Sequence, residues 1–141
     1  MKKVLIDLNV ILDFLGKRAN HQEAAHIFML CENKKVKGFV SAHEITTLAY
    51  FLTERFKNKS GAKNIINEIL DIFTTIPINE KTLRDSLNSN ISDFEDAVIE
   101  QAALKENLDY IISNNIDDFN KSKVKAIIPV EFISILKNST N

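Results

Sequence analysis

Glycine, proline and cysteine are scarce in this chain of 141 residues, and tryptophan is absent. Its three glycines and the lack of a GK[ST] motif exclude a glycine-rich loop that cradles nucleotide phosphates. The single cysteine, Cys31, allows no internal disulfide, which is typical of a reducing compartment. Its apolar neighbours in AAHIFMLCE predict that Cys31 is a small residue of the core.

Long apolar runs are missing as well. No segment approaches the roughly 20 apolar residues that a membrane-spanning helix needs. Asp7 interrupts the first apolar run, so the N-terminus lacks the pattern of a secretion signal. We therefore expect a cytoplasmic protein without a membrane partner.

Neither sign of charge dominates, because 18 basic residues face 19 acidic ones and the formal net charge is −1. This balance does not indicate a nucleic-acid partner and does not exclude one, since binding depends on where the basic side chains lie. With 45% hydrophobic and 26% charged residues, the composition is that of an ordinary globular protein. We predict one domain over residues 1–137 and a polar tail over residues 138–141.

Short β-rich runs alternate with longer segments of helical periodicity. The expected strands span residues 3–6, 36–41, 75–78, 109–113 and 126–130. The expected helices span residues 9–15, 21–35, 42–56, 61–75, 80–87, 92–106 and 131–137. The polar segment 57–64 is expected to turn between two antiparallel helices. This alternation predicts an α/β protein, a three-layer α/β/α sandwich with a mainly parallel central sheet.

Acidic residues recur where strands end and helices begin. Asp7 directly follows the first strand, Glu44 lies just beyond the second, and Asp96 lies in the first turn of the helix that begins SDFED. Asp117 and Asp118 follow the strand DYIIS. Sites of parallel α/β sheets form beyond the carboxyl ends of the strands, so we expect these side chains to converge at one edge.

Each acid also has a local structural explanation. Asp7 could be a turn or N-cap residue, and Glu44 could complete a capping box with Ser41. The segment SDFED offers two such pairs, Ser92 with Glu95 and Asp93 with Asp96. Asp117 and Asp118 could be solvated loop residues.

Taken together, converging carboxylates repel one another unless a cation or a shifted pKa relieves the repulsion. A set of oxygen donors without cysteine suits Mg²⁺ or Mn²⁺ better than zinc. Such a cation can lower the pKa of a bound water and neutralise charge on a phosphodiester. The acids therefore favour metal-assisted phosphoryl chemistry over nucleophilic catalysis by a Ser-His-Asp set, which the chain does not offer.

The chain contains, in order, four stretches that cover nearly all of it: VLIDLNVILDFLGKR, SAHEITTLAYFL, SDFEDAVIEQAALKENLDYIISNNIDDF and IIPVEFI. They resemble the PIN-domain (PilT N-terminus-like) family, in particular its small VapC-type toxins. The most specific part is DFEDA followed by DYIIS and an N-x-x-DF loop. The resemblance implies a PIN-like fold and a ribonuclease that uses Mg²⁺ or Mn²⁺ to hydrolyse RNA. It also implies a homodimer and a cognate antitoxin protein as partner.

The resemblance assigns the catalytic, metal-binding roles to Asp7, Glu44 and Asp96. Asp93 lies one helical turn before Asp96 and is a further candidate ligand. The family's fourth acid usually stands in a T-x-D pattern after the strand DYIIS, where this chain reads SNN. In its place, Asn115 could offer an amide oxygen or Asp118 could offer a carboxylate.

Residues close to Asp7 have expected roles too. Asn9 is retained from the family pattern, whereas Leu8 stands where threonine is common. We expect Asn9 to orient Asp7 or a water by a hydrogen bond. Arg18 is the candidate contact for RNA phosphates because it lies close to Asp7 in sequence. Asp13 is expected on the surface of its helix.

Two functions stay open on the sequence. The first is a metal-dependent endoribonuclease that acts as the toxin of a toxin–antitoxin pair. The second is a catalytically decayed PIN-fold module that binds RNA or protein, and the absent fourth acid is its main support. Metal-stimulated cleavage of RNA that is lost in an Asp7→Asn variant would reject the second.

Overall fold

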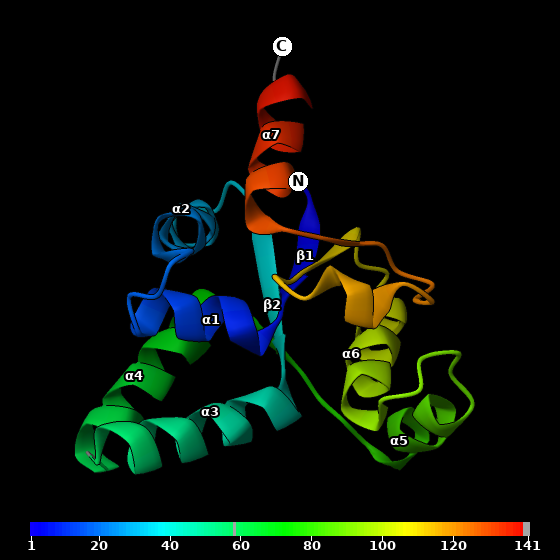
Figure 1. Ribbon diagram of the computed structural model, residues 1–141, viewed down its shortest axis with the longest axis horizontal. Coiled ribbons are helices and arrows are strands. Elements are labelled where there is room, and N and C mark those ends of the chain that lie inside the picture. The colour runs from blue at the N-terminus through cyan, green and yellow to red at the C-terminus, as the bar shows by residue number, and fades with distance from the viewer. Residues whose placement is uncertain (58, 140–141) are drawn as a thin grey trace.

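A five-stranded parallel sheet forms the middle layer of the protein (Figure 1). The computed structural model describes residues 1–57 and 59–139. The strands are β1 (Lys3–Ile6), β2 (Lys37–Ser41), β3 (Thr74–Ile76), β4 (Tyr110–Ile112) and β5 (Ala126–Ile127). Their order is β3-β2-β1-β4-β5, and each neighbouring pair is parallel, so the carboxyl ends share one edge. The predicted parallel sheet is confirmed.

Helices cover both faces of the sheet and complete the three predicted layers (Figure 1). On one side lie α1 (Leu8–Leu15), α2 (His21–Glu32), α3 (Ala42–Phe56), α4 (Lys59–Ile72) and α7 (Pro129–Ser139). The other side has α6 (Phe94–Lys105), with α5 (Glu80–Leu87) packed against it, and the short 3-10 helix η1 (Ile116–Phe119). None of the helices in the described residues combines the length and the apolar character of a membrane span.

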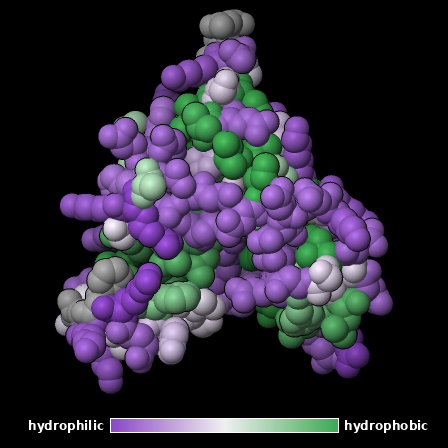
Figure 2. All heavy atoms as spheres, in the orientation of Figure 1, coloured by the Kyte–Doolittle hydropathy of each residue, from purple (hydrophilic) through white to green (hydrophobic). Residues whose placement is uncertain are grey.

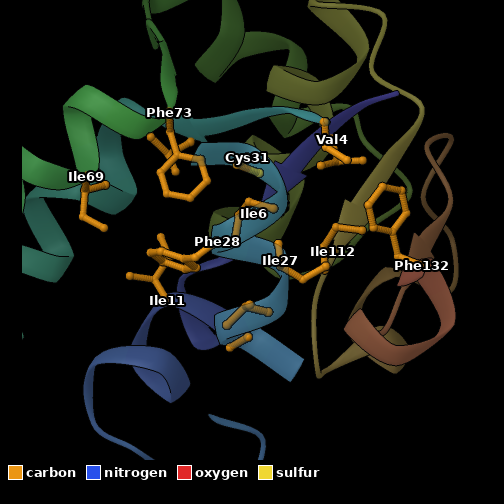
Figure 3. Close-up of a cluster of buried hydrophobic side chains, with 14 of the residues drawn as sticks. Val4, Ile6, Ile11, Ile27, Phe28, Cys31, Ile69, Phe73, Ile112 and Phe132 are labelled. Atoms are coloured by element: carbon orange, nitrogen blue, oxygen red, sulfur yellow. The ribbon is translucent and has the colours of Figure 1, made fainter. Parts of the chain in front are cut away.

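Alternate side chains of β1 enter two separate hydrophobic cores. Ile6 points into the core beneath α1, α2, α3, α4 and α7, whereas Leu5 points into the core beneath α6. Figure 3 shows the first core, in which the rings of Phe28 and Phe73 meet edge to face with their centroids 5.1 Å apart. Because both faces of the sheet are covered, Val4, Leu5 and Ile6 of β1 are all buried and apolar, and the first acidic residue, Asp7, comes directly after them.

Gly38 of β2 lies where two neighbouring side chains leave no room for a methyl group. A Cβ atom there would lie 2.7 Å from Sγ of Cys31 and 2.7 Å from Cδ1 of Phe73. Cys31 itself is 5% exposed, which confirms its predicted place in the core, and burial raises the pKa of its thiol to about 12.

We expect Gly38→Ala to lower the free energy of unfolding by about 1–3 kcal/mol, because the added methyl overpacks this part of the core. Urea denaturation measures the loss. Adding Cys31→Ala should recover part of it, since one of the two closest atoms is then removed. A Gly38→Ala variant as stable as the parent would contradict the close packing.

β3 and β5 end at least two residues earlier than the sequence pattern predicts. β3 stops at Ile76, directly before Pro77, and β5 stops at Ile127, two residues before Pro129. Proline has no N–H for the hydrogen-bond ladder and is favoured in the first turn of a helix. The prediction that the strand over residues 126–130 continues beyond Ile127 was therefore wrong, because α7 begins at Pro129.

The turn predicted over residues 57–64 is mostly helix, because α4 begins at Lys59. Asn58 lies outside the described residues. Lys57 ends α3 with a φ of 49°, a left-handed conformation that turns the chain away from the helix axis. The two helices then pack against each other, as predicted for this pair.

At the other end of the chain, α7 extends through Ser139. Residues 138 and 139 of the predicted polar tail are therefore helical. Residues 140 and 141 lie outside the described residues, so the boundary of the domain at residue 137 stays a prediction.

Candidate active site

Asp7 is the first residue after β1, at the carboxyl edge of the sheet. Its backbone N–H donates to the carbonyl oxygen of Ile112 at 2.9 Å, which ties the end of β1 to β4. Oδ1 accepts from the N–H of Leu8 at 2.9 Å, so Asp7 is the N-cap of α1. Oδ2 accepts from the Ser113 hydroxyl at 2.8 Å and from the Asn9 amide at 3.2 Å. These donors hold the carboxylate from two sides.

Glu44 lies in the first turn of α3 and is 1% exposed. Ser41 makes no side-chain bond to the helix backbone, and its hydroxyl instead donates to Oε1 of Glu44 at 3.0 Å. The backbone N–H of Leu8, which also donates to Oδ1 of Asp7, donates to Oε2 of Glu44 at 2.6 Å. One N–H shared by two carboxylates sets Asp7 and Glu44 side by side. Burial, and then the neighbouring charge of Asp7, raises the pKa of Glu44 well above its usual range.

Asp96 lies half-buried in the first turn of α6. The carboxylate of Asp93 caps this helix by accepting from the N–H of Asp96 at 3.0 Å, so the alternative capping role of Asp93 is confirmed. Burial is the largest cause that raises the pKa of Asp96 to about 7, and the charges of Asp93, Asp118, Asp7 and Glu95 add to it. The charges of Asp7 after β1 and Asp118 after β4 therefore repel the carboxylate of Asp96 at the start of α6.

An acidic pocket of about 270 Å³ lies beside Asp96. Its lining includes Asp93, Asp96, Asp117, Asp118 and one basic residue, Lys121. Four carboxylates against one ammonium make the pocket attractive to cations. Its volume is enough for several water molecules.

The site and the sheet together agree with one known family. The sequence profile of the PIN domain matches residues 3–117. The chain belongs to the PIN-domain family. The matched region contains Asp7, Glu44 and Asp96. No functionally curated protein matches the chain in sequence.

Solved structures share the fold of this PIN domain at low sequence identity. VapBC2 from Rickettsia felis, bound to promoter DNA, gives a TM-score of 0.67 at 18% identity, over 89% of this chain and 98% of its own. A toxin–antitoxin complex from Klebsiella pneumoniae gives a TM-score of 0.67 at 18% identity, over 89% of this chain and 97% of its own. VapC20 of Mycobacterium tuberculosis, a sarcin–ricin loop cleaving toxin, gives a TM-score of 0.65 at 13% identity, over 86% of this chain and 98% of its own. These likenesses establish the fold.

Of the two candidates for the fourth acid of the PIN domain, Asp118 lies beside Asp96. Asp118 lines the acidic pocket, and its charge contributes to the raised pKa of Asp96. Asn115 is exposed at the start of η1 and is not part of that lining. The ligand roles of both residues stay predictions.

Sequence reasoning missed Glu100, which lies in α6 and is 1% exposed. The hydroxyl of Ser89 donates to Oε1 at 2.7 Å, and the N–H of Lys123 donates to Oε2 at 2.8 Å. The segments that follow Ser89 and precede Lys123 line the acidic pocket, so Glu100 holds two of its walls together. The available signal was its spacing of four residues from Asp96, on the same face of the helix.

The expectation that Asp13 lies on the surface of α1 was wrong, because Asp13 is 8% exposed. Nε of Arg18 lies 3.0 Å from Oδ1 of Asp13, and Nδ2 of Asn114 donates to Oδ2. The loop after β4 thus covers this face of α1. Arg18, with 44% of its side chain exposed, is paired with Asp13, and its contact with RNA stays a prediction.

His43 precedes Glu44, and neither of its buried ring nitrogens has a hydrogen-bond partner among the described residues. Burial lowers the pKa of His43, although the charge of Asp7 acts in the opposite direction. The ring is therefore neutral at pH 7 and adds no positive charge to the carboxylates beside it.

The chemistry of the donors fits a hard divalent cation. Asp7, Glu44 and Asp96 offer carboxylate oxygens, which Mg²⁺ and Mn²⁺ prefer. The raised pKa values of Glu44 and Asp96 mean that the negative charges are unfavourable as they stand. Among residues 1–57 and 59–139, no three Asp, Glu, His or Cys side chains form a ready-made metal-holding group. The carboxylates therefore fit such a cation by type without forming a complete cage.

Proposed function

We propose that this PIN domain is a metal-dependent endoribonuclease and the toxin of a toxin–antitoxin pair. The observation that carries the proposal is the acidic pocket that Asp93, Asp96 and Asp118 line together. There, burial and then the charges of carboxylates from separate segments raise the pKa of Asp96 to about 7. A repulsive cluster of this kind costs stability and adds nothing to the hydrophobic core. Such a cost is expected where side chains are kept for their chemistry.

In this proposal Asp7, Glu44 and Asp96 hold Mg²⁺ or Mn²⁺. The bound cation would supply a water of lowered pKa and neutralise charge on the phosphodiester. The two donors to Oδ2 of Asp7 keep that carboxylate oriented. Lys121, in the lining of the acidic pocket, would meet a phosphate oxygen of the RNA.

Proteins of the same fold support the substrate and the partner. VapC20 is a sarcin–ricin loop cleaving toxin, which supports RNA as the substrate. The Klebsiella pneumoniae structure is a toxin–antitoxin complex, which supports an inhibitory protein partner. An arginine of such an antitoxin would pair well with the carboxylates of the acidic pocket.

A homodimer belongs to the same proposal. On α3 and α4, Leu48 and Ile69 are core residues, whereas Tyr50 is 64% and Leu70 is 45% exposed. Figure 2 shows further hydrophobic side chains over α5, where Leu87 is 71% exposed. These exposed side chains are the candidates for the contact, and sedimentation equilibrium of the purified chain tests it.

The metal requirement is the direct test of the enzymatic proposal. Chain purified with EDTA is expected to leave RNA intact and to cleave it once Mg²⁺ or Mn²⁺ is added, because carboxylates alone do not activate water sufficiently. Sequencing of the RNA ends locates the cuts. As a control, Asp85→Asn removes a carboxylate that pairs with Lys81 at 2.8 Å on α5, and cleavage should not change.

Asn115 favours the second candidate, a PIN-fold module that binds RNA or protein without cleaving. It stands where the family usually has a fourth acid. In that case RNA would stay intact at every concentration of Mg²⁺ and Mn²⁺ while binding persisted. This result would reject the ribonuclease.

A further inference from the structure

A continuous chain of hydrogen bonds joins Asp7 to the end of α1. Nδ2 of Asn9 donates to Oδ2 of Asp7 at 3.2 Å, and the backbone N–H of Asn114 donates to Oδ1 of Asn9 at 3.1 Å. The side chain of Asn114 donates in turn to Oδ2 of Asp13. Arg18 closes the chain with its Nε 3.0 Å from Oδ1 of Asp13.

The partners of Asn9 determine which way its amide faces. The oxygen and the nitrogen of a carboxamide have nearly the same shape, so orientation depends on neighbouring donors and acceptors. The N–H of Asn114 can only pair with Oδ1, which turns Nδ2 towards Asp7 and towards Oγ of Ser113 at 3.1 Å. A flipped amide would set a donor against the N–H of Asn114 and break the bond to Asp7.

Asp13 anchors the turn that supplies these donors. A carboxylate that is 8% exposed is costly unless it is paired, and Arg18 and Asn114 provide the pairing. Ser113, the residue before Asn114, donates to Oδ2 of Asp7 at 2.8 Å. The two donors to Oδ2 of Asp7 are therefore the residue before Asn114 in the chain and the residue whose Oδ1 accepts from the N–H of Asn114, and Asp13 holds the side chain of Asn114.

We infer that Asp13 and Asn114 are positioning residues, which hold the amide of Asn9 and the turn after β4 against the carboxylate of Asp7. Arg18 acts as the anchor of Asp13 in this arrangement. The effect on RNA cleavage rests on the proposed function, whereas the effect on Asn9 does not. Two measurements keep these parts separate.

The first measurement follows the side-chain amide of Asn9 by NMR, with its signals assigned from their loss in Asn9→Ala. Asp13→Ala is expected to shift and broaden these signals, and Asp85→Ala, which removes an exposed ion pair, should leave them unchanged. Unchanged Asn9 signals in folded Asp13→Ala would overturn the inference. Shifted signals in a protein that cleaves no RNA would support the positioning and reject only the proposed function.

The second measurement is the affinity for Mn²⁺, followed by kcat and KM on RNA. Asp13→Ala is expected to weaken Mn²⁺ binding and to lower kcat by about 10-fold, as loss of partners behind a metal ligand does, with KM unchanged. Asp13→Asn keeps an acceptor for Asn114 and should restore part of the loss. A fall in melting temperature alone, with Mn²⁺ affinity and kcat intact, would mean a merely structural role.

A double-mutant cycle tests whether Asp13 acts through Asn9. The effect of Asp13→Ala on Mn²⁺ affinity should shrink in an Asn9→Ala background, because both substitutions cut the same chain of hydrogen bonds. Additive effects would overturn the inference. If Asp13→Ala does not fold, Asn114→Ala replaces it, since it keeps the backbone N–H and loses only the bond to Asp13.

Discussion

The Asp7→Asn variant is expected to lose RNA cleavage by more than about 100-fold, because the proposed function makes Asp7 a direct ligand of the metal ion, and losing a ligand costs more than losing the residues that orient it. The fold should survive. The side-chain amide oxygen of the new asparagine can still accept from Ser113 and Asn9, which in the parent donate to Oδ2 of Asp7. The N–H of Leu8 loses its acceptor on residue 7 but keeps Oε2 of Glu44 at 2.6 Å.

Initial rates of cleavage in Mn²⁺, with circular dichroism to confirm folding, measure the effect of Asp7→Asn. Asp85→Asn is the matched control, because it makes the same chemical change in an exposed ion pair outside the acidic pocket. If Asp7→Asn cleaved RNA within a few-fold of the parent, Asp7 would have no place in the catalytic site.

Asp96→Asn is expected to abolish cleavage and yet to make the protein more stable at neutral pH. The pKa of Asp96 is raised from 3.8 to about 7 in the folded protein, by burial and by the neighbouring carboxylates, so folding opposes its ionisation. Its contribution to stability is fully present below about pH 4 and is lost as the pH rises through about 7. Asparagine does not ionise and escapes this loss, and the Asp93 cap to the backbone N–H remains.

Urea denaturation in EDTA, from about pH 4 to about pH 8, tests the sign of this effect. The parent should lose stability relative to Asp96→Asn as the pH rises, and the two should converge at the acidic end. Asp85→Asn should follow the parent. A variant less stable than the parent at pH 8 would mean that the Asp96 carboxylate stabilises the fold.

The sequence by itself determined the fold class and the edge of the sheet at which the acids gather. Runs such as KVLI and DYIIS are recognisable because the buried strands of a parallel sheet covered on both faces carry consecutive apolar residues, here VLI and YII. The core position of Cys31 followed from its local pattern in the same way, whereas the cap at Asp93 was one of two alternatives that the sequence offered. The family motifs also follow from the sequence, since they are collinear over most of the chain.

Only the tertiary structure decided which polar side chains are buried together. The partners of Asp13 include Asn114, 101 residues further along the chain, and one partner of Glu100 is 23 residues away. Helical periodicity relates a residue to the axis of its own helix, so it cannot report a loop that folds over that face. The choice of Asp118 over Asn115 beside Asp96 depends likewise on how η1 turns after β4. Hydrogen-bond partners distant in sequence determine which carboxylates can act together, and the folded chain alone brings them into contact.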